Sequence, residues 1–174
     1  MSQRNIIHMY ISFSPTYFYL LIFLSYFFLS SIYDIKNRSV PCILHFLFML
    51  IGFPIFVYLN FHAEASLSPE DVFNIVKRFF PGFILCLISI ASRGGLGIGD
   101  AIFITVSAFF IPFNHIIILV FSGFITASVT GICILVYGKL KGKHVYTVSL
   151  PFIPFMLPGL YFILKDMEYA GGFL

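Results

Sequence analysis

Charged residues are scarce in this chain of 174 residues: Asp, Glu, Lys and Arg together make up 10%, whereas soluble domains contain about 25%. Hydrophobic residues make up 60%. This composition excludes a water-soluble globule, a disordered chain and a nucleic-acid-binding module. A membrane span takes roughly 20 apolar residues. The length therefore predicts an all-α, polytopic integral membrane protein with about six transmembrane helices, in a single membrane-embedded domain covering residues 1–174.

Tryptophan is absent and cysteine is rare. Without tryptophan, anchoring at the membrane surface falls to tyrosine. The three cysteines, Cys42, Cys86 and Cys133, lie far apart in the sequence, and the five histidines form no pair spaced as ligands on one helix face. This pattern argues against a zinc site, a redox motif and a disulfide-stapled fold, so no metal site is predicted.

Apolar runs separated by short polar connections predict where the chain crosses the membrane. The expected spans cover residues 13–33, 42–59, 79–91, 101–111, 115–137 and 148–164. A short interfacial helix is expected to begin within Ser68–Asp71, and residues 92–100 form a glycine-dense break. The first run is longer than the apolar part of a secretion signal and is followed by no cleavage site, so we interpret it as a retained span.

Two expected spans separate Asp34 from Asp100, so both aspartates should emerge on the same side of the membrane. That side would carry six Lys and Arg residues and the opposite side four. The first set is Lys36, Arg38, Arg93, Lys139, Lys141 and Lys143, and the second is Arg4, Lys77, Arg78 and Lys165. Because positively charged loops stay inside, the aspartates are expected at the cytoplasmic face of the cell membrane. Asp34 and Asp100 are the only acidic residues on that side of the predicted topology.

An ionisable group at a membrane boundary is costly and indicates a function. If Asp34 and Asp100 converge, they cannot both ionise cheaply and will share a proton. One carboxylate can then activate a water while the other protonates a leaving group. Structural alternatives exist for each residue, because Asp100 can be the N-cap of the helix that follows it, and Asp34 can pair with Lys36 or Arg38.

The glycines before Asp100 also allow two interpretations. They can permit a tight turn, or they can let a substrate backbone come close to Asp100 because no side chain stands in the way. These glycines are Gly94, Gly95, Gly97 and Gly99. A phosphate-binding loop is excluded, since no Gly-Lys-Ser/Thr sequence and no preceding strand accompany them.

Three motifs follow one another along the chain. The first, at 34–41, is an Asp followed by a basic loop and by a Pro seven residues later; the second, at 95–100, reads Gly-Leu-Gly-Ile-Gly-Asp; the third, at 150–155, reads Leu-Pro-Phe-Ile-Pro-Phe. In this order and spacing they resemble the type IV prepilin leader peptidases, which are membrane aspartyl proteases of the GxGD type.

The resemblance implies that Asp34 and Asp100 are the catalytic pair of an aspartic-type endopeptidase. It implies supporting or substrate-binding roles for Gly95, Gly97, Gly99, Pro41, Lys36, Arg38, Pro151 and Pro154. The implied substrates are prepilin-like or pseudopilin precursors, in which a short basic leader precedes an apolar helix, cleaved at the cytoplasmic face without a cofactor. The chain resembles the short, peptidase-only form, so methylation of the product is not expected.

The sequence departs from this family at two positions. Ile102 stands where the family commonly has Lys, and Cys42 where it often has Asn. Two other functions therefore remain open, namely an ion- or proton-coupled transporter and a non-catalytic homologue acting in pilus or secretion assembly. Pro151 and Pro154 can also be ordinary prolines at a helix start, and the lysines of residues 139–143 can set the topology or contact anionic lipids.

Overall fold

The computed structural model describes residues 15–61, 69–92, 97–141 and 150–169. Within these ranges the chain forms six α-helices and one short 3-10 helix, and no strand. In chain order they are α2 (Pro15–Asn37), α3 (Cys42–Phe61), α4 (Pro69–Ala91), α5 (Ile98–Ser107), α6 (Phe113–Leu140), η1 (Ile153–Met156) and α7 (Leu157–Tyr169). The predicted all-α architecture is confirmed.

Three helices, α2, α4 and α6, are long and apolar enough to cross a membrane, while α3 and α5 are shorter apolar helices. α5 has 10 residues and is therefore only about 15 Å long, half the thickness of a bilayer core. Large apolar side chains such as Ile43, Phe73 and Ile90 are each 68% exposed. Lipid is the environment in which such a surface is stable, so the chain is a membrane protein.

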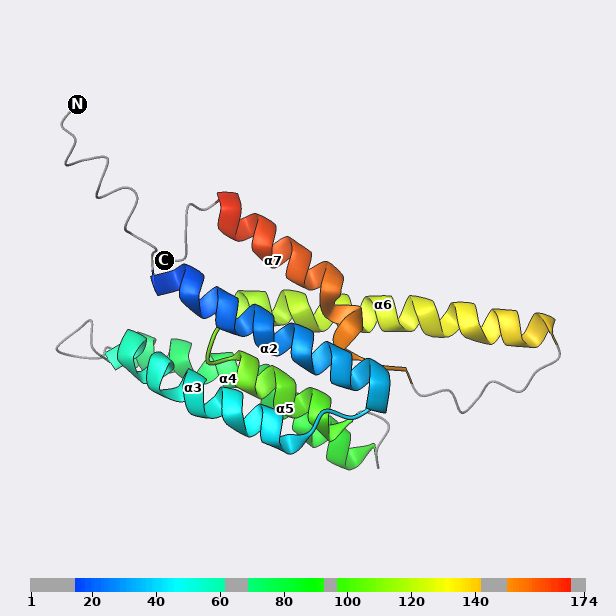
Figure 1. Ribbon diagram of the computed structural model, residues 1–174, viewed down its shortest axis with the longest axis horizontal. Coiled ribbons are helices and arrows are strands. Elements are labelled where there is room, and N and C mark those ends of the chain that lie inside the picture. The colour runs from blue at the N-terminus through cyan, green and yellow to red at the C-terminus, as the bar shows by residue number, and fades with distance from the viewer. Residues whose placement is uncertain (1–14, 62–68, 93–96, 142–149, 170–174) are drawn as a thin grey trace.

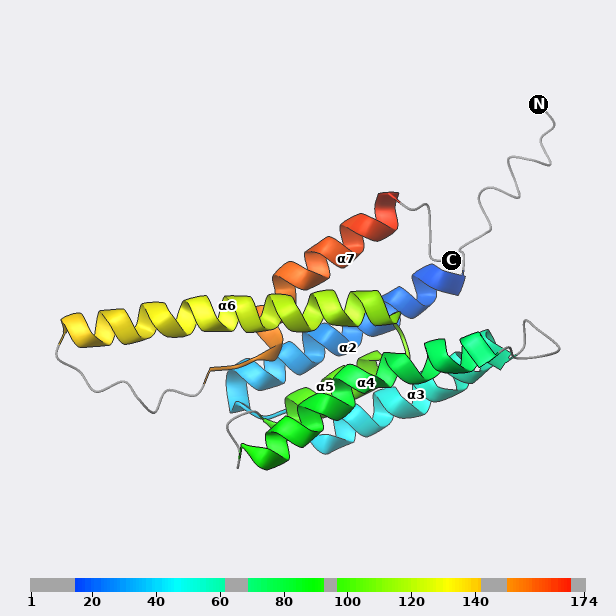
Figure 2. The same ribbon diagram turned by 180° about the vertical axis from the view of Figure 1, so that it is seen from behind.

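The helices alternate in direction (Figure 1), as the reverse view also shows (Figure 2). α4 contacts α5 and α6, α3 contacts α5, and η1 contacts α2, α6 and α7. The ends of α2 and α6 and the beginnings of α3, α5 and α7 face the same way. The C-terminal half of α6 extends beyond the other helices at that end.

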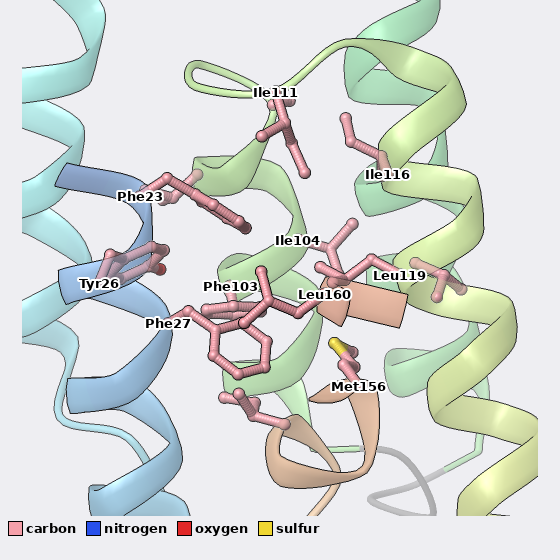
Figure 3. Close-up of a cluster of buried hydrophobic side chains, with 14 of the residues drawn as sticks. Phe23, Tyr26, Phe27, Phe103, Ile104, Ile111, Ile116, Leu119, Met156 and Leu160 are labelled. Atoms are coloured by element: carbon pink, nitrogen blue, oxygen red, sulfur yellow. The ribbon is translucent and has the colours of Figure 1, made fainter. Parts of the chain in front are cut away.

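The short helix α5 forms the centre of the packing. It contacts α3, α4 and α6, and its side chains Ala101, Phe103 and Ile104 are fully buried. Figure 3 shows Phe103 between the aromatic residues of α2 and the apolar residues of η1 and α7. On the α2 side, Tyr26 stacks on Phe103 with ring centroids 5.0 Å apart, and Phe27 meets the same ring edge-on at 5.9 Å. These contacts fix α5 against the helix that carries Asp34.

The structure corrects the sequence prediction for the third span. The expected interfacial helix at 68–71 and the span at 79–91 are one continuous helix, α4. Lys77 and Arg78 lie inside this helix, over the rings of Phe113 and Phe56 at 5.8 and 5.9 Å. Aromatic faces attract cations, which lets a membrane helix carry both charges.

The last span also begins later than expected. Residues 142–149 lie outside the described part of the chain, and α7 begins only at Leu157, after the 3-10 turn η1. Pro154 occupies the first turn of η1, where its missing N–H costs nothing. The segment Leu150–Phe152 precedes η1 and therefore approaches the bundle without a regular helical structure.

Candidate active site

The sequence predicts that Asp34 lies in the loop after the first span. In the structure it lies within α2. The helix continues for three residues to Asn37, and the N–H of Arg38 donates a 2.8 Å hydrogen bond to the carbonyl oxygen of Asp34. Arg38 has φ 52°, the left-handed conformation in which helices commonly end. Asp34 is 5% exposed, while its neighbours Tyr33 and Ile35 are exposed. The helix therefore directs this one carboxylate into the bundle.

Backbone amides of the η1 segment bind the Asp34 carboxylate. The N–H of Ile153 donates a 3.0 Å hydrogen bond to Oδ2, and the backbone of Phe152 donates another. The first N–H groups of a helix have no partner within it, so they are natural donors to a carboxylate. Lys36 and Arg38 have exposed side chains, and the carboxylate of Asp34 is buried. Pro151 and Pro154 are half-buried and flank the two donating residues.

Asp100 occupies the first turn of α5, but it is not the N-cap residue that the sequence suggested. The N-cap is Gly97, and Asp100 is the third residue of the helix. Its N–H donates a 3.1 Å hydrogen bond to the carbonyl oxygen of Gly97, and its carboxylate accepts one from the Gly97 backbone. This is the reciprocal half of a capping box, and an acid here also complements the helix dipole.

Gly97 and Gly99 differ in the space that a side chain would find at each position. A Cβ atom on Gly97 would lie 2.9 Å from Oδ2 of Asp100, so the carboxylate occupies the space that a side chain would need. A Cβ on Gly99 would meet only ordinary contacts, with Val40 N and His45 Nε2, both at 3.9 Å. The turn before Asp100 thus packs on the segment that contains Pro41. Gly95, with Gly94, lies outside the described residues.

Asp34 and Asp100 come together at the same end of the bundle, where α2 ends and α5 begins (Figure 1). They are close enough for the charge of Asp34 to act on the carboxylate of Asp100. Two carboxylates that converge can share one proton, because ionising both at close range is costly. The pair can therefore present one ionised and one protonated carboxyl group to a bound water, which is the arrangement of general acid–base hydrolysis.

A polar pair that the sequence motifs did not reveal lies next to this site. The hydroxyl of Tyr26 and Nδ1 of His45 are 2.6 Å apart and buried. A signal was present, because Tyr26, Ser30 and Asp34 recur every four residues and so share one face of an apolar helix. Within the described residues, no group of three His, Cys, Asp or Glu side chains is arranged to hold a metal ion.

A comparison with protein-family models matches residues 21–132 to the type IV leader peptidase family. The chain belongs to this family. No significant match to a curated protein or to a solved structure was found. The family suspected from the motifs is confirmed.

The matched region of this type IV leader peptidase contains Asp34, Pro41 and the glycine motif that ends at Asp100. It ends before Pro151 and Pro154. The structure nevertheless brings the segment between these prolines onto Asp34, through the amides of Phe152 and Ile153. Of the ten site residues expected from the sequence, all except Gly95 lie in the described residues.

Proposed function

We propose that this leader peptidase removes the short basic leader from prepilin-like or pseudopilin precursors at the cytoplasmic face of the cell membrane, using Asp34, Asp100 and a water molecule. One observation carries the proposal: the end of α2, which carries Asp34, and the start of α5, which carries Asp100, lie at one end of the bundle, and the charge of Asp34 acts on the carboxylate of Asp100. Carboxylates are rare in such a setting unless they serve a function.

The proposed reaction requires that the carboxyl groups of Asp34 and Asp100 together hold one proton. The ionised carboxylate takes a proton from the water as the water oxygen attacks the scissile carbonyl carbon. The protonated carboxyl group then gives its proton to the leaving nitrogen while the carbon–nitrogen bond breaks. Backbone amides hold both carboxylates, from Ile153 and Phe152 on Asp34 and from Gly97 on Asp100. Their geometry is therefore set before the substrate arrives.

The setting also supports a substrate with an apolar helix. Ile32 and Ile35, next to Asp34, are exposed large apolar side chains, and the bilayer lets a second apolar helix lie beside α2 and the start of α5. The leader of the precursor would remain on the cytoplasmic side. Lys139 and Lys141, both exposed at the end of α6, are suited to contact anionic lipid headgroups.

Co-expression with a prepilin-like precursor tests the proposal. The wild-type chain should shorten the precursor on a gel, and Asp34→Asn and Asp100→Asn should each abolish the shortening because neither amide can exchange the proton. Asp166→Asn is the matched control, because Asp166 is exposed at the other end of the bundle, where it contacts His115 at 3.1 Å. Full processing by either active-site variant would overturn the assignment, and a cation-dependent flux without proteolysis would favour a transporter.

A non-catalytic role in pilus or secretion assembly is the second candidate, and Ile102 is the observation that favours it. This residue packs against the hydrophobic core two positions after Asp100, where leader peptidases of this type commonly carry a lysine. One experiment distinguishes the non-catalytic role from the peptidase role. Normal assembly by the double variant Asp34→Asn/Asp100→Asn would establish the non-catalytic role, and loss of assembly would support the peptidase.

A further inference from the structure

One face of α2 carries a line of buried polar groups that ends at Asp34. Tyr26 and Ser30 are fully buried and Asp34 is 5% exposed, although most residues between them face outward. These three positions are spaced by four, so they are stacked along the helix axis. A polar line inside a membrane helix is costly to bury, which indicates that it supports the carboxylate at its end.

Tyr26 is held tightly in this line. Its ring lies between Phe48 of α3, with centroids 4.7 Å apart, and Phe103 of α5, at 5.0 Å. Its hydroxyl oxygen is 2.6 Å from Nδ1 of His45, which stands near the start of α3. Tyr26 therefore joins α2 to both of the helices that pack around the active site.

The same contact bears on which nitrogen of the His45 ring carries the proton. The Tyr26 hydroxyl can donate its hydrogen to Nδ1 of His45, which lies within hydrogen-bond distance. With Nδ1 accepting, a neutral imidazole carries its proton on Nε2. This nitrogen is buried and has no hydrogen-bond partner among the described residues. It is therefore a donor that the local packing leaves available.

The available nitrogen faces the first turn of α5. It lies 3.9 Å from the position that a Cβ atom would take on Gly99, and the backbone nitrogen of Val40 lies at the same distance from that position. Gly99 immediately precedes Asp100. His45 and Val40 together thus border the turn that presents the second carboxylate, and Tyr26 connects them to the helix that presents the first.

We propose that Tyr26 and His45 are positioning residues, which hold the first turn of α5, and with it Asp100, at its working distance from Asp34. This inference rests on the proposed peptidase function only for its effect on the reaction rate. The pair touches neither the substrate nor the reacting water. It acts by fixing where the two helix ends stand relative to each other, and a displacement of about 1 Å at such a site lowers the rate by roughly 100-fold.

The decisive variant is Tyr26→Phe, which removes the hydroxyl but keeps the ring between Phe48 and Phe103, so the fold should persist. Its kcat for the precursor should fall roughly 10- to 100-fold with KM changed less than about twofold. Tyr33→Phe is the matched control, because Tyr33 is on the same helix with its side chain 39% exposed, and its kinetics should match the wild type. An unchanged kcat in Tyr26→Phe would overturn the inference.

Two substitutions of His45 distinguish the roles of its two ring nitrogens. His45→Asn keeps an acceptor near the position of Nδ1 but has no atom at Nε2, whereas His45→Gln keeps an amide nitrogen near Nε2. If His45 acts through Nε2 on the turn at Gly99, Gln should restore more of kcat than Asn. Equal kcat in both variants, or a better Asn variant, would contradict this role of Nε2.

A distance measurement tests the positioning role of Tyr26 and His45 without an activity assay. Nitroxide labels on Lys36→Cys and Ile98→Cys, both exposed positions, report the spacing of the end of α2 from the start of α5 after serine has replaced Cys42, Cys86 and Cys133. Electron spin resonance should show a broader or shifted distance distribution in Tyr26→Phe and an unchanged one in Tyr33→Phe. An unchanged distribution in Tyr26→Phe would overturn positioning. A wild-type chain that cleaves no precursor would instead overturn the proposed function and leave this comparison valid.

Discussion

The amide of Ile153 donates its hydrogen to Oδ2 of Asp34 over 3.0 Å, joining residues 119 positions apart. This bond connects the third sequence motif to the first. It explains in physical terms why a Pro-Phe-x-Pro-Phe segment accompanies an aspartate far away in the chain. The prolines shape a short turn whose first amides have no helical partner and so bind the carboxylate.

Ile153→Pro tests this bond, because it removes the only hydrogen that Ile153 can donate. Proline also disfavours the helical conformation of Phe152, with φ −87° and ψ −40°, just before it. A hydrogen bond to a charged group contributes about 1.5–3 kcal/mol, so kcat/KM should fall roughly 10- to 100-fold. Ile153→Ala is the matched control, since it keeps the amide and loses the buried side chain. It should lower the melting temperature with a smaller loss of activity, and an equal loss of activity in both variants would contradict the role of the amide.

Gly97 and Gly99 should differ in their tolerance of alanine. Gly97 has φ −65° and ψ 131°, a conformation open to any residue, but its new Cβ would meet Oδ2 of Asp100 at 2.9 Å. Gly97→Ala must therefore displace the carboxylate and should lower kcat roughly 10- to 100-fold. Gly99→Ala meets nothing closer than 3.9 Å and should stay within about threefold of the wild type. Precursor cleavage by the two purified variants makes the comparison, and equal activities would contradict the steric explanation.

Much of the fold could be predicted because apolar runs and helix-breaking residues can be identified from the local sequence. The break before α3 was correct, since Pro41 and the polar residues before it stop one helix and allow the next to begin at Cys42. The family followed from the order and spacing of the motifs, and the match to the family model confirms it. Helix parity predicted that Asp34 and Asp100 lie at the same end of the bundle, and their role as a catalytic pair stays a prediction.

Details that depend on tertiary contacts could not be predicted. α2 runs past Asp34 to Asn37 and ends where Arg38 takes a left-handed conformation, which the sequence does not announce. α4 is continuous through Lys77 and Arg78, whose charges lie over aromatic rings of α6 and α3. His45 looked unremarkable because its partner, Tyr26, lies on another helix. For Lys77, Arg78 and His45 the deciding neighbour is distant in the sequence.

Gly82 and Gly131 should respond in opposite directions to alanine. A Cβ on Gly82 of α4 would lie 2.9 Å from both the Cα and the N of Thr105 in α5, and backbone atoms cannot turn aside. Gly82→Ala should therefore lower the free energy of unfolding by about 1–3 kcal/mol. Gly131 in α6 has only Leu150 Cδ1 nearby, at 3.9 Å. There the better helix propensity of alanine should raise that free energy by about 0.5–1 kcal/mol. Unfolding in detergent measures both, and a loss of stability in Gly131→Ala equal to that in Gly82→Ala would contradict the packing argument.

Labelling of introduced cysteines should show which end of the bundle faces the cytoplasm. Lys139 is exposed at the end of α6 on the aspartate side, and Glu70 is exposed at the start of α4 on the opposite side. The excess of Lys and Arg on the aspartate side predicts that this side faces the cytoplasm. In a chain with serine at its three native cysteine positions, a membrane-impermeant maleimide should label Glu70→Cys in intact cells. It should label Lys139→Cys only after the membrane is opened. Labelling of both positions after opening is the control for accessibility. The reverse pattern in intact cells would place Asp34 and Asp100 at the outer face, where a cytoplasmic leader could not reach them.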